Sequence, residues 1–227
     1  KKWIMAVTGL VLLVFVIGHM LGNLKLYLGQ ESLDHYGEFL RRAGEPLLPP
    51  GAALWIARIG LLVCAVLHIW MAVVLSRQSL EARPIPYRQN ARLSFSYASY
   101  TMRWGGVVIL LFVLYHLMHL TWGNMHPDFR GGLIYHNVTT GLARPLAALI
   151  YIVANVVLGL HIYHGLWSSF QTLGINNPRY NAWRRPFALT VALIIAVGNI
   201  SMPLAVMTGI VKQPPAQAAP TAQASAE

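Results

Sequence analysis

Histidines inside apolar runs are the residues of this chain best suited to chemistry. His19 and His68 each stand alone in such a run, and two further runs read Tyr-His-Leu-Met-His over 115–119 and Leu-His-Ile-Tyr-His over 160–164. An ionisable side chain at membrane depth is costly and by default functional. A neutral imidazole there can bind a metal, relay a proton or hydrogen bond to a carbonyl in a packed core. Because the histidines occupy four separate runs, we favour a shared ligand-binding role over four unrelated core histidines.

The elements that carry these histidines read as membrane-spanning helices. The chain of 227 residues is 56% hydrophobic and only 11% charged, whereas a soluble domain has about 25% charged residues. Apolar runs near the length that crosses a bilayer predict five spans, at about 3–24, 54–75, 102–122, 145–167 and 186–206. The sequence therefore predicts an all-α membrane protein, a five-helix transmembrane bundle over 1–211, and a disordered tail over 212–227.

The distribution of lysine and arginine predicts which side each loop faces. Ten cations share one side with a single acid, whereas the other side has six cations and six acids. The ten are Lys1, Lys2, Arg77, Arg83, Arg88, Arg92, Arg103, Arg179, Arg184 and Arg185. The positive-inside rule then places the N-terminus in the cytoplasm and the C-terminus outside, in a cytoplasmic membrane of the bacterial type. The net charge of +10 thus indicates topology, and is compatible with docking of a soluble partner, rather than nucleic-acid binding.

Helical rise places the histidines at two depths. At 1.5 Å per residue, His19 lies about 24 Å from the inner interface, and His116 and His119 lie about 18 and 22 Å from it. His68 and His161, on spans that run the other way, lie about 20 and 24 Å from the outer interface. His19 therefore pairs in height with His116 or His119, and His68 pairs with His161. The two levels differ in depth by roughly 13 Å. Two such levels suit two stacked b haems, each with an imidazole on either side of its iron.

Two further histidines and two arginines are secondary candidates. His119 and His164 each follow a candidate ligand by three residues and share its helix face, so either could replace that ligand, bond a haem propionate or contact a quinone. Arg58 either snorkels to the outer interface or bonds a propionate of the outer haem. Arg103 either bonds the inner haem or only sets topology. Spacing alone leaves these alternatives open.

The loop after the first span is predicted to contain a short helix that lies on the outer surface and caps the bundle. Ser32 can cap its start and Gly44 can end it. His35 is then a surface residue. The apolar residues that share one face of this helix are Leu33, Tyr36, Phe39 and Leu40.

These residues resemble a known family, the five-helix, dihaem cytochrome b subunit of succinate:quinone oxidoreductases, which is also found with quinol:fumarate reductases. The resemblance covers about residues 2–210. Its most specific parts, taken together, are the order of four histidines and the element His-x-x-x-Gly-Leu-Trp-Ser that begins at His161. The matching stretches are Lys2–Gly9, Val16–Leu24, Leu67–Trp70, Ala98–Arg103, Phe112–Leu117 and Leu160–Phe170.

The resemblance implies a specific set of iron ligands. It pairs His19 with His116 at the outer haem and His68 with His161 at the inner haem. Members of the family can lack histidine at the position three residues after each of the last two ligands, so the resemblance favours His116 and His161. The extra histidines, His119 and His164, are a departure from the family pattern, and the resemblance gives them no role.

The resemblance also implies partners and a function. The chain would anchor a flavoprotein subunit and an iron–sulfur subunit on the cytoplasmic face, in a complex that can form higher oligomers. Electrons from succinate would pass through the iron–sulfur clusters and the haems to a quinone, often menaquinone. The chain itself has no glycine-rich nucleotide loop after a strand, and Cys64 is its single cysteine, so flavin and clusters must belong to the partners. The subunit is then not catalytic alone.

Two points stay open. The residues of a quinone site are not readable, and an outer-side site near His119, Arg58 and the surface helix is a hypothesis. Two other classes of protein also fit the histidines. One is the cytochrome b anchor of a formate dehydrogenase or hydrogenase, and the other is a non-redox transporter or scaffold whose histidines relay protons.

Overall fold

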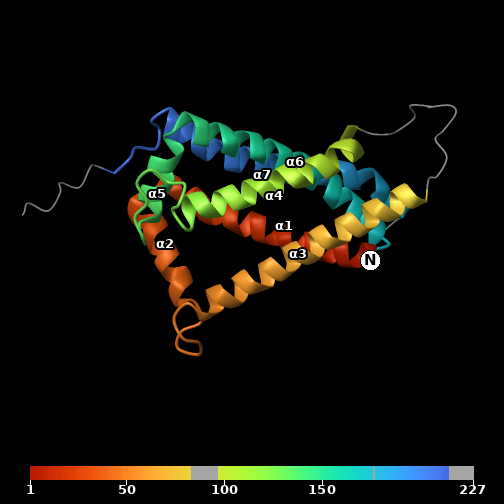
Figure 1. The fold of residues 1–227 in the computed structure, drawn as a ribbon, viewed down its shortest axis with the longest axis horizontal. Helices are drawn as coiled ribbons and strands as arrows, with labels where there is room; N and C mark the ends of the chain where they lie inside the picture. The colour runs from red at the N-terminus through yellow and green to blue at the C-terminus, as the bar shows by residue number, and fades with distance from the viewer. Residues whose placement is uncertain (83–96, 176, 215–227) are drawn as a thin grey trace, which may run out of the picture.

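The structure, a computed structural model, describes residues 1–82, 97–175 and 177–214, and every regular element in these ranges is a helix (Figure 1). Five helices are long and apolar enough to cross a membrane, which confirms the predicted all-α, multi-pass class. They are α1 (Lys2–Asn23), α3 (Ala52–Glu81), α4 (Tyr97–Leu120), α6 (Pro145–Thr172) and α7 (Pro178–Met207). The predicted tail beyond 214 and the cations Arg83, Arg88 and Arg92 lie outside the described residues.

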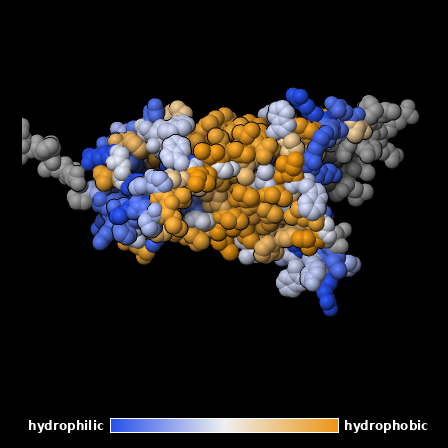
Figure 2. Space-filling model, turned by 90° about the horizontal axis from the view of Figure 1, so that it is seen from below, coloured by the Kyte–Doolittle hydropathy of each residue, from blue (hydrophilic) through white to orange (hydrophobic). Residues whose placement is uncertain are grey.

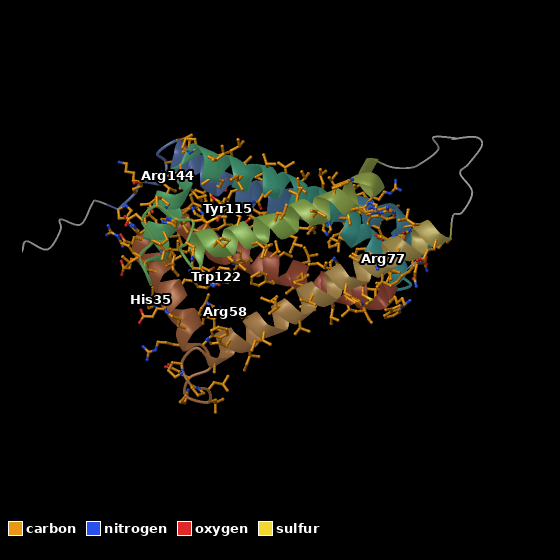
Figure 3. The ribbon with its side chains drawn as sticks, in the orientation of Figure 1. His35, Arg58, Arg77, Tyr115, Trp122 and Arg144 are labelled. Carbon is orange, nitrogen blue, oxygen red and sulfur yellow. The ribbon has the colours of Figure 1, made fainter. Side chains whose placement is uncertain are left out.

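Three shorter elements complete the described chain, namely η1 (Leu24–Leu28), α2 (Gln30–Arg42) and α5 (Ile134–Leu142). Figure 1 shows α2 and α5 at one end of the bundle and the N-terminus at the other. Following the predicted topology, we call the end with α2 and α5 the outer end. Arg77 lies at the inner end, whereas His35 and Arg144 lie at the outer end (Figure 3). Hydrophilic side chains gather at both ends of an apolar band in Figure 2, as expected for a membrane-spanning bundle.

The bundle is closely packed on one side and open on the other. α6 packs along α7, α4 and α1, and α3 packs along α1. Between α1, α6 and α7, buried Met20, Ile162 and Ile195 belong to one apolar cluster. A side chain at Gly198 of α7 would meet the Met20 sulfur at 2.5 Å, so the backbones of α1 and α7 approach closely there. In Figure 1, α3 diverges from α4 toward the outer end.

The surface helix is present, but it begins earlier than predicted. α2 starts at Gln30, after Gly29 makes the turn from η1 at φ 95°, and no side chain caps it, so the predicted cap at Ser32 is wrong. Gly44 follows the helix end at φ 95°, as a terminating glycine does. His35 is exposed, as predicted. Of the four predicted apolar contacts, Leu33 is 2% exposed but Phe39 is 60% exposed, so the buried face is narrower than expected.

The last long helix also begins earlier, at Pro178 rather than Pro186. The Asn177 side chain accepts a hydrogen bond of 2.9 Å from the Arg179 amide, and Pro178 occupies the first helical turn. This pair is a strong start signal, because an asparagine cap satisfies a free amide and proline has none to satisfy. Pro186 therefore lies inside α7, whose first two turns carry the basic residues of the inner end.

Helix α5 was not predicted from the sequence, and it is capped from a distant part of the chain. Its own N-cap, Leu133, makes no side-chain hydrogen bond. Instead Asp34 of α2 accepts a hydrogen bond of 2.9 Å from the Tyr135 amide in the first turn. A side chain at Gly37 would collide with Ile134 of α5, so the two helices approach closely there. Asp34 thus fastens the two outer helices to each other.

Replacing Asp34 with alanine should loosen this outer layer. Loss of a helix cap costs about 1 kcal/mol, which corresponds to roughly fivefold faster amide hydrogen exchange when exchange follows local opening of α5. The measurement is exchange at Tyr135 and its neighbours in the detergent-solubilised protein. Asp34→Asn retains a side-chain oxygen that can accept the bond, so it should preserve protection. Equal exchange in the wild type and in Asp34→Ala would contradict the capping role.

Candidate functional site

The outer candidate pair consists of His19 on α1 and His116 on α4. Their ring centroids are 5.8 Å apart and the ring planes are almost perpendicular, at 88°. Phe15, one turn before His19, stacks on it at 5.3 Å. His19 is among the exposed residues although it lies within the apolar span.

The inner candidate pair consists of His68 on α3 and His161 on α6. Their ring centroids are 6.3 Å apart, with an interplanar angle of 65°. Both side chains are half-buried. The structure therefore brings His68 to His161, as matched by depth, and brings His19 to His116, one of the two partners that depth left open. Whether they bind iron stays a prediction.

Each pair spans a diagonal of the four helices that carry histidine. Among these four helices α3 packs on α1, α1 on α6, and α6 on α4, whereas α3 and α4 do not pack along each other in the described residues. Within the described residues, α1 and α4 do not pack along each other, and neither do α3 and α6. The histidines are where these opposite helices meet. Side chains that reach inward from opposite helices of a bundle are a common way to hold a cofactor in its core.

The separation within each pair fits two imidazoles on one metal ion. An imidazole nitrogen binds a metal at about 2 Å, and the ring centre lies about 1.2 Å further, so two opposed rings have centroids roughly 6 Å apart. The observed 5.8 Å and 6.3 Å lie on either side of this value. The donor set of two neutral imidazoles in an apolar span is also the one that b-type haem iron takes.

His68 is held by α1 in the tautomer that a metal ligand needs. Its Nδ1 lies 3.1 Å from the Met5 carbonyl oxygen and 3.4 Å from the Thr8 hydroxyl. A carbonyl oxygen can only accept, so Nδ1 carries the proton and Nε2 keeps a free lone pair. Metal-binding histidines usually donate their other nitrogen in this way. A Cβ added at Gly9 would meet the His68 ring at 2.9 Å, so this glycine gives the ring its place against α1.

His119 does not face His19. It is 1% exposed, stacks on Tyr115 at 5.3 Å, and lies 5.1 Å from the ring of His126 in the outer loop. A Cβ at Gly141 of α5 would meet its ring at 2.8 Å. His119 is thus enclosed between α4, α5 and the outer loop, and this placement favours His116 as the partner of His19.

His164 is also turned to a different neighbour from His161. Its ring lies 5.5 Å from Trp167, and the Arg185 guanidinium lies 5.0 Å from the same indole. The Nδ1 atoms of His161 and His164 are buried without a hydrogen-bond partner among the described residues. Buried nitrogens of this kind usually find a partner. This level of the bundle therefore has hydrogen-bonding capacity that the described chain does not satisfy.

The two candidate arginines lie at opposite ends of the bundle. Arg58, labelled in Figure 3, is exposed on α3. Its guanidinium lies 5.1 Å from the centroid of the Trp55 ring, a cation–π contact. Arg103 is exposed at the inner part of α4. Their roles toward propionates stay predictions. His119 is 1% exposed and Arg58 is exposed, and an outer quinone site near them and the surface helix stays a prediction.

The outer loop holds a polar network that sequence reasoning missed. His126 Nε2 donates to the Asn137 carbonyl at 2.8 Å, and its Nδ1 accepts from the Asp128 amide at 3.0 Å. His136 Nε2 lies 3.0 Å from the Asp128 carboxylate, which Arg130 also contacts at 3.2 Å. The bond from Arg130 is the main reason that the pKa of Asp128 is lowered. A signal was present, since the loop from 126 to 136 carries two histidines, an acid and an arginine.

The outer loop should become less stable in mild acid because of His126. Burial lowers the pKa of His126 from its ordinary value of 6.5, with opposing contributions from the Asn137 carbonyl and Asp128. The unfolded loop then binds more protons than the folded loop, so the stabilisation is complete above 6.5 and is lost as the pH falls below it.

Protection of the 126–137 amides, corrected for intrinsic exchange, should therefore fall between about pH 7.5 and about pH 5.5. His126→Gln should remove most of this dependence, whereas His35→Gln, at an exposed histidine, should leave it intact. A pH dependence that persists in His126→Gln would assign the effect to another group.

No protein-family model, no curated protein and no solved structure matches this chain. The two histidine pairs lie at different levels of the bundle, and each brings two imidazoles from different helices together.

Proposed function

We propose that this chain is the dihaem cytochrome b anchor subunit of a succinate:quinone oxidoreductase. One observation carries the proposal: the apolar bundle holds two pairs of histidines. The ring centroids are 5.8 Å apart in one pair and 6.3 Å apart in the other, and each pair spans a diagonal of the bundle. His19 and His116 would hold the outer haem, and His68 and His161 the inner haem. When bound, each haem supplies a carrier that gains and loses one electron.

The protein residues would bind, orient and insulate these carriers. The Met5 carbonyl fixes the tautomer of His68, and helices α1, α3, α4 and α6 surround both levels with apolar side chains. Two carriers stacked along the bundle would link its inner and outer ends. This arrangement suits electron transfer between an iron–sulfur subunit on one side and a quinone, in our proposal menaquinone, in the membrane.

The inner end would receive the soluble partners. Lys1, Lys2 and Arg77 belong to this end, together with the arginines of the first two turns of α7. Such a basic surface complements an acidic patch and speeds association with a partner that carries one. We propose that the iron–sulfur subunit docks here and that the flavoprotein subunit binds through it, with the succinate chemistry on those partners.

The test is purification of the chain with its native partners from membranes. The proposal predicts two b haems per copy of the chain, a reduced b-type absorption band, and co-purification of a covalently flavinylated protein that oxidises succinate. A molybdenum or nickel partner with the same two haems would instead identify a formate dehydrogenase or hydrogenase anchor. A pure complex without any b-type band would overturn the redox proposal and favour a transporter or scaffold.

A further inference from the structure

One buried hydroxyl lies between two imidazoles at the outer level. Tyr151 of α6 is 7% exposed, and its hydroxyl oxygen lies 3.1 Å from Nδ1 of His116 and 3.1 Å from Nδ1 of His119. The Tyr151 ring is fixed by an edge contact with Phe112 at 5.1 Å. The sequence did not single out this tyrosine, and it left three alternative roles open for His119.

Counting protons shows that the two imidazoles cannot play the same part. A tyrosine hydroxyl has one proton to donate and can also accept. Nδ1 of a neutral imidazole either carries a proton and donates, or lacks one and accepts. The hydroxyl could accept from both rings only by leaving its own buried proton without a partner among the described residues, so it donates to one ring and accepts from the other. The tautomers of His116 and His119 are therefore coupled through Tyr151.

Metal binding by His116 selects one of the two arrangements. A ligand that binds through Nε2 needs its lone pair there, so its proton must be on Nδ1 and must be donated to Tyr151. The Tyr151 hydroxyl proton then goes to Nδ1 of His119, whose own proton lies on Nε2. In the opposite arrangement, Nε2 of His116 would carry a proton and could not bind a metal.

We propose that Tyr151 and His119 are positioning residues for the outer haem ligand, which they hold in its metal-binding tautomer. This inference rests on the proposed function. The hydrogen bond that His116 donates to Tyr151 makes the imidazole a stronger electron donor, which favours ferric over ferrous iron. The bond from Tyr151 to His119 makes the hydroxyl oxygen a better acceptor, because hydrogen bonds in a chain polarise one another. The enclosure of His119, otherwise unexplained, then has a purpose.

Tyr151→Phe is the main test, because it removes the hydroxyl and keeps the ring. The outer haem should become easier to reduce. Mutating a residue that hydrogen bonds to a metal ligand typically costs at least tenfold in metal affinity or activity. We therefore expect a change of about tenfold in the ferric-to-ferrous ratio, which corresponds to about 59 mV in midpoint potential. Redox titration of each haem in the purified complex measures this shift, and the electron paramagnetic resonance signal of the ferric outer haem should change with it.

Two internal controls separate this role from a general disturbance. The inner haem of the same sample should keep its potential. Tyr115→Phe removes a hydroxyl from the neighbouring ring, 6.1 Å from Tyr151, but leaves both contacts of Tyr151 in place, so it should leave the outer potential unchanged. A shift of equal size in Tyr115→Phe would overturn the inference.

A second variant keeps the test decisive if Tyr151→Phe does not retain the outer haem. His119→Phe preserves stacking on Tyr115 and removes the acceptor of the Tyr151 proton, so it should shift the outer potential in the same direction. In the double variant the shift should equal that of Tyr151→Phe alone, because both changes act through one hydroxyl.

Full haem content with an unchanged potential in His119→Phe, or strictly additive shifts, would overturn the inference. Two haems in the wild type with these negative results would leave the proposed function standing. A wild-type complex without haem would remove the proposed function and this inference together.

Discussion

Replacing His161 with alanine should remove the inner haem and leave the outer one. The His161 ring faces His68 at 6.3 Å across the diagonal between α6 and α3, and no other imidazole is placed against His68 among the described ring contacts. Without His161 only one imidazole of the pair, His68, would remain to hold the inner haem. Haem content should fall from about two to about one per copy of the chain, because the inner haem would lose one of its two protein ligands.

His164→Ala is the matched control for this change. His164 is on the same helix, three residues away, and loses the same imidazole on mutation, but its ring is turned to Trp167 at 5.5 Å. It should retain close to two haems, with at most a change in the potential of the inner one. Haem quantification and the reduced b-band amplitude of both variants give the answer. Loss of haem in His164→Ala with retention in His161→Ala would reverse the assignment of the inner ligand.

The spans and the pairing of the histidines could be predicted because lipid imposes simple geometry. A helix in a bilayer satisfies its own backbone and rises by a fixed amount per residue, so sequence position converts directly into depth. This arithmetic matched His68 with His161, and the structure brings these two rings together. It left His116 and His119 as alternatives because they differ by less than one turn. In the structure, the ring contact of His116 with His19 and the packing of α5 and the outer loop around His119 separate them.

The features that were missed depend on contacts between distant residues. Helix α5 takes its cap from Asp34, about a hundred residues earlier in the chain, so no local start signal marks it. Tyr151 reads as one more aromatic residue in an apolar run until α6 packs against α4. The early start of α7 had a local signal in Asn177 and Pro178, but hydropathy favours the apolar part of a helix over its charged first turns.

Gly9→Val should remove the inner haem although it replaces no candidate ligand. The nearest atoms to a Cβ at this position are Cε1 of His68, at 2.9 Å, and its Nδ1, at 3.3 Å. The ring cannot simply move away, because Nδ1 is hydrogen bonded to the Met5 carbonyl on the same helix as Gly9. The branched side chain therefore has to break this bond or displace the His68 ring from its place 6.3 Å from His161. Misplacing a metal ligand in this way costs about 10- to 100-fold in affinity.

Gly60→Val supplies the control for helix propensity and bulk. A Cβ at Gly60 of α3 meets nothing within 4 Å, so the substitution adds the same side chain in open space. Gly60 also lies eight residues from His68, about 12 Å along the helix and out of reach of the inner pair. Gly60→Val should keep the inner haem, and Gly9→Val should lose it while the outer haem stays. Gly9→Ala should have an inner-haem content between those of the two valine variants. The midpoint potential of its inner haem should be shifted, because a small movement of the His68 ring can accommodate a single methyl group. Full inner haem at the wild-type potential in Gly9→Val would show that His68 does not need its place against α1, and would remove the support that its bond to the Met5 carbonyl gives to His68 as an inner ligand.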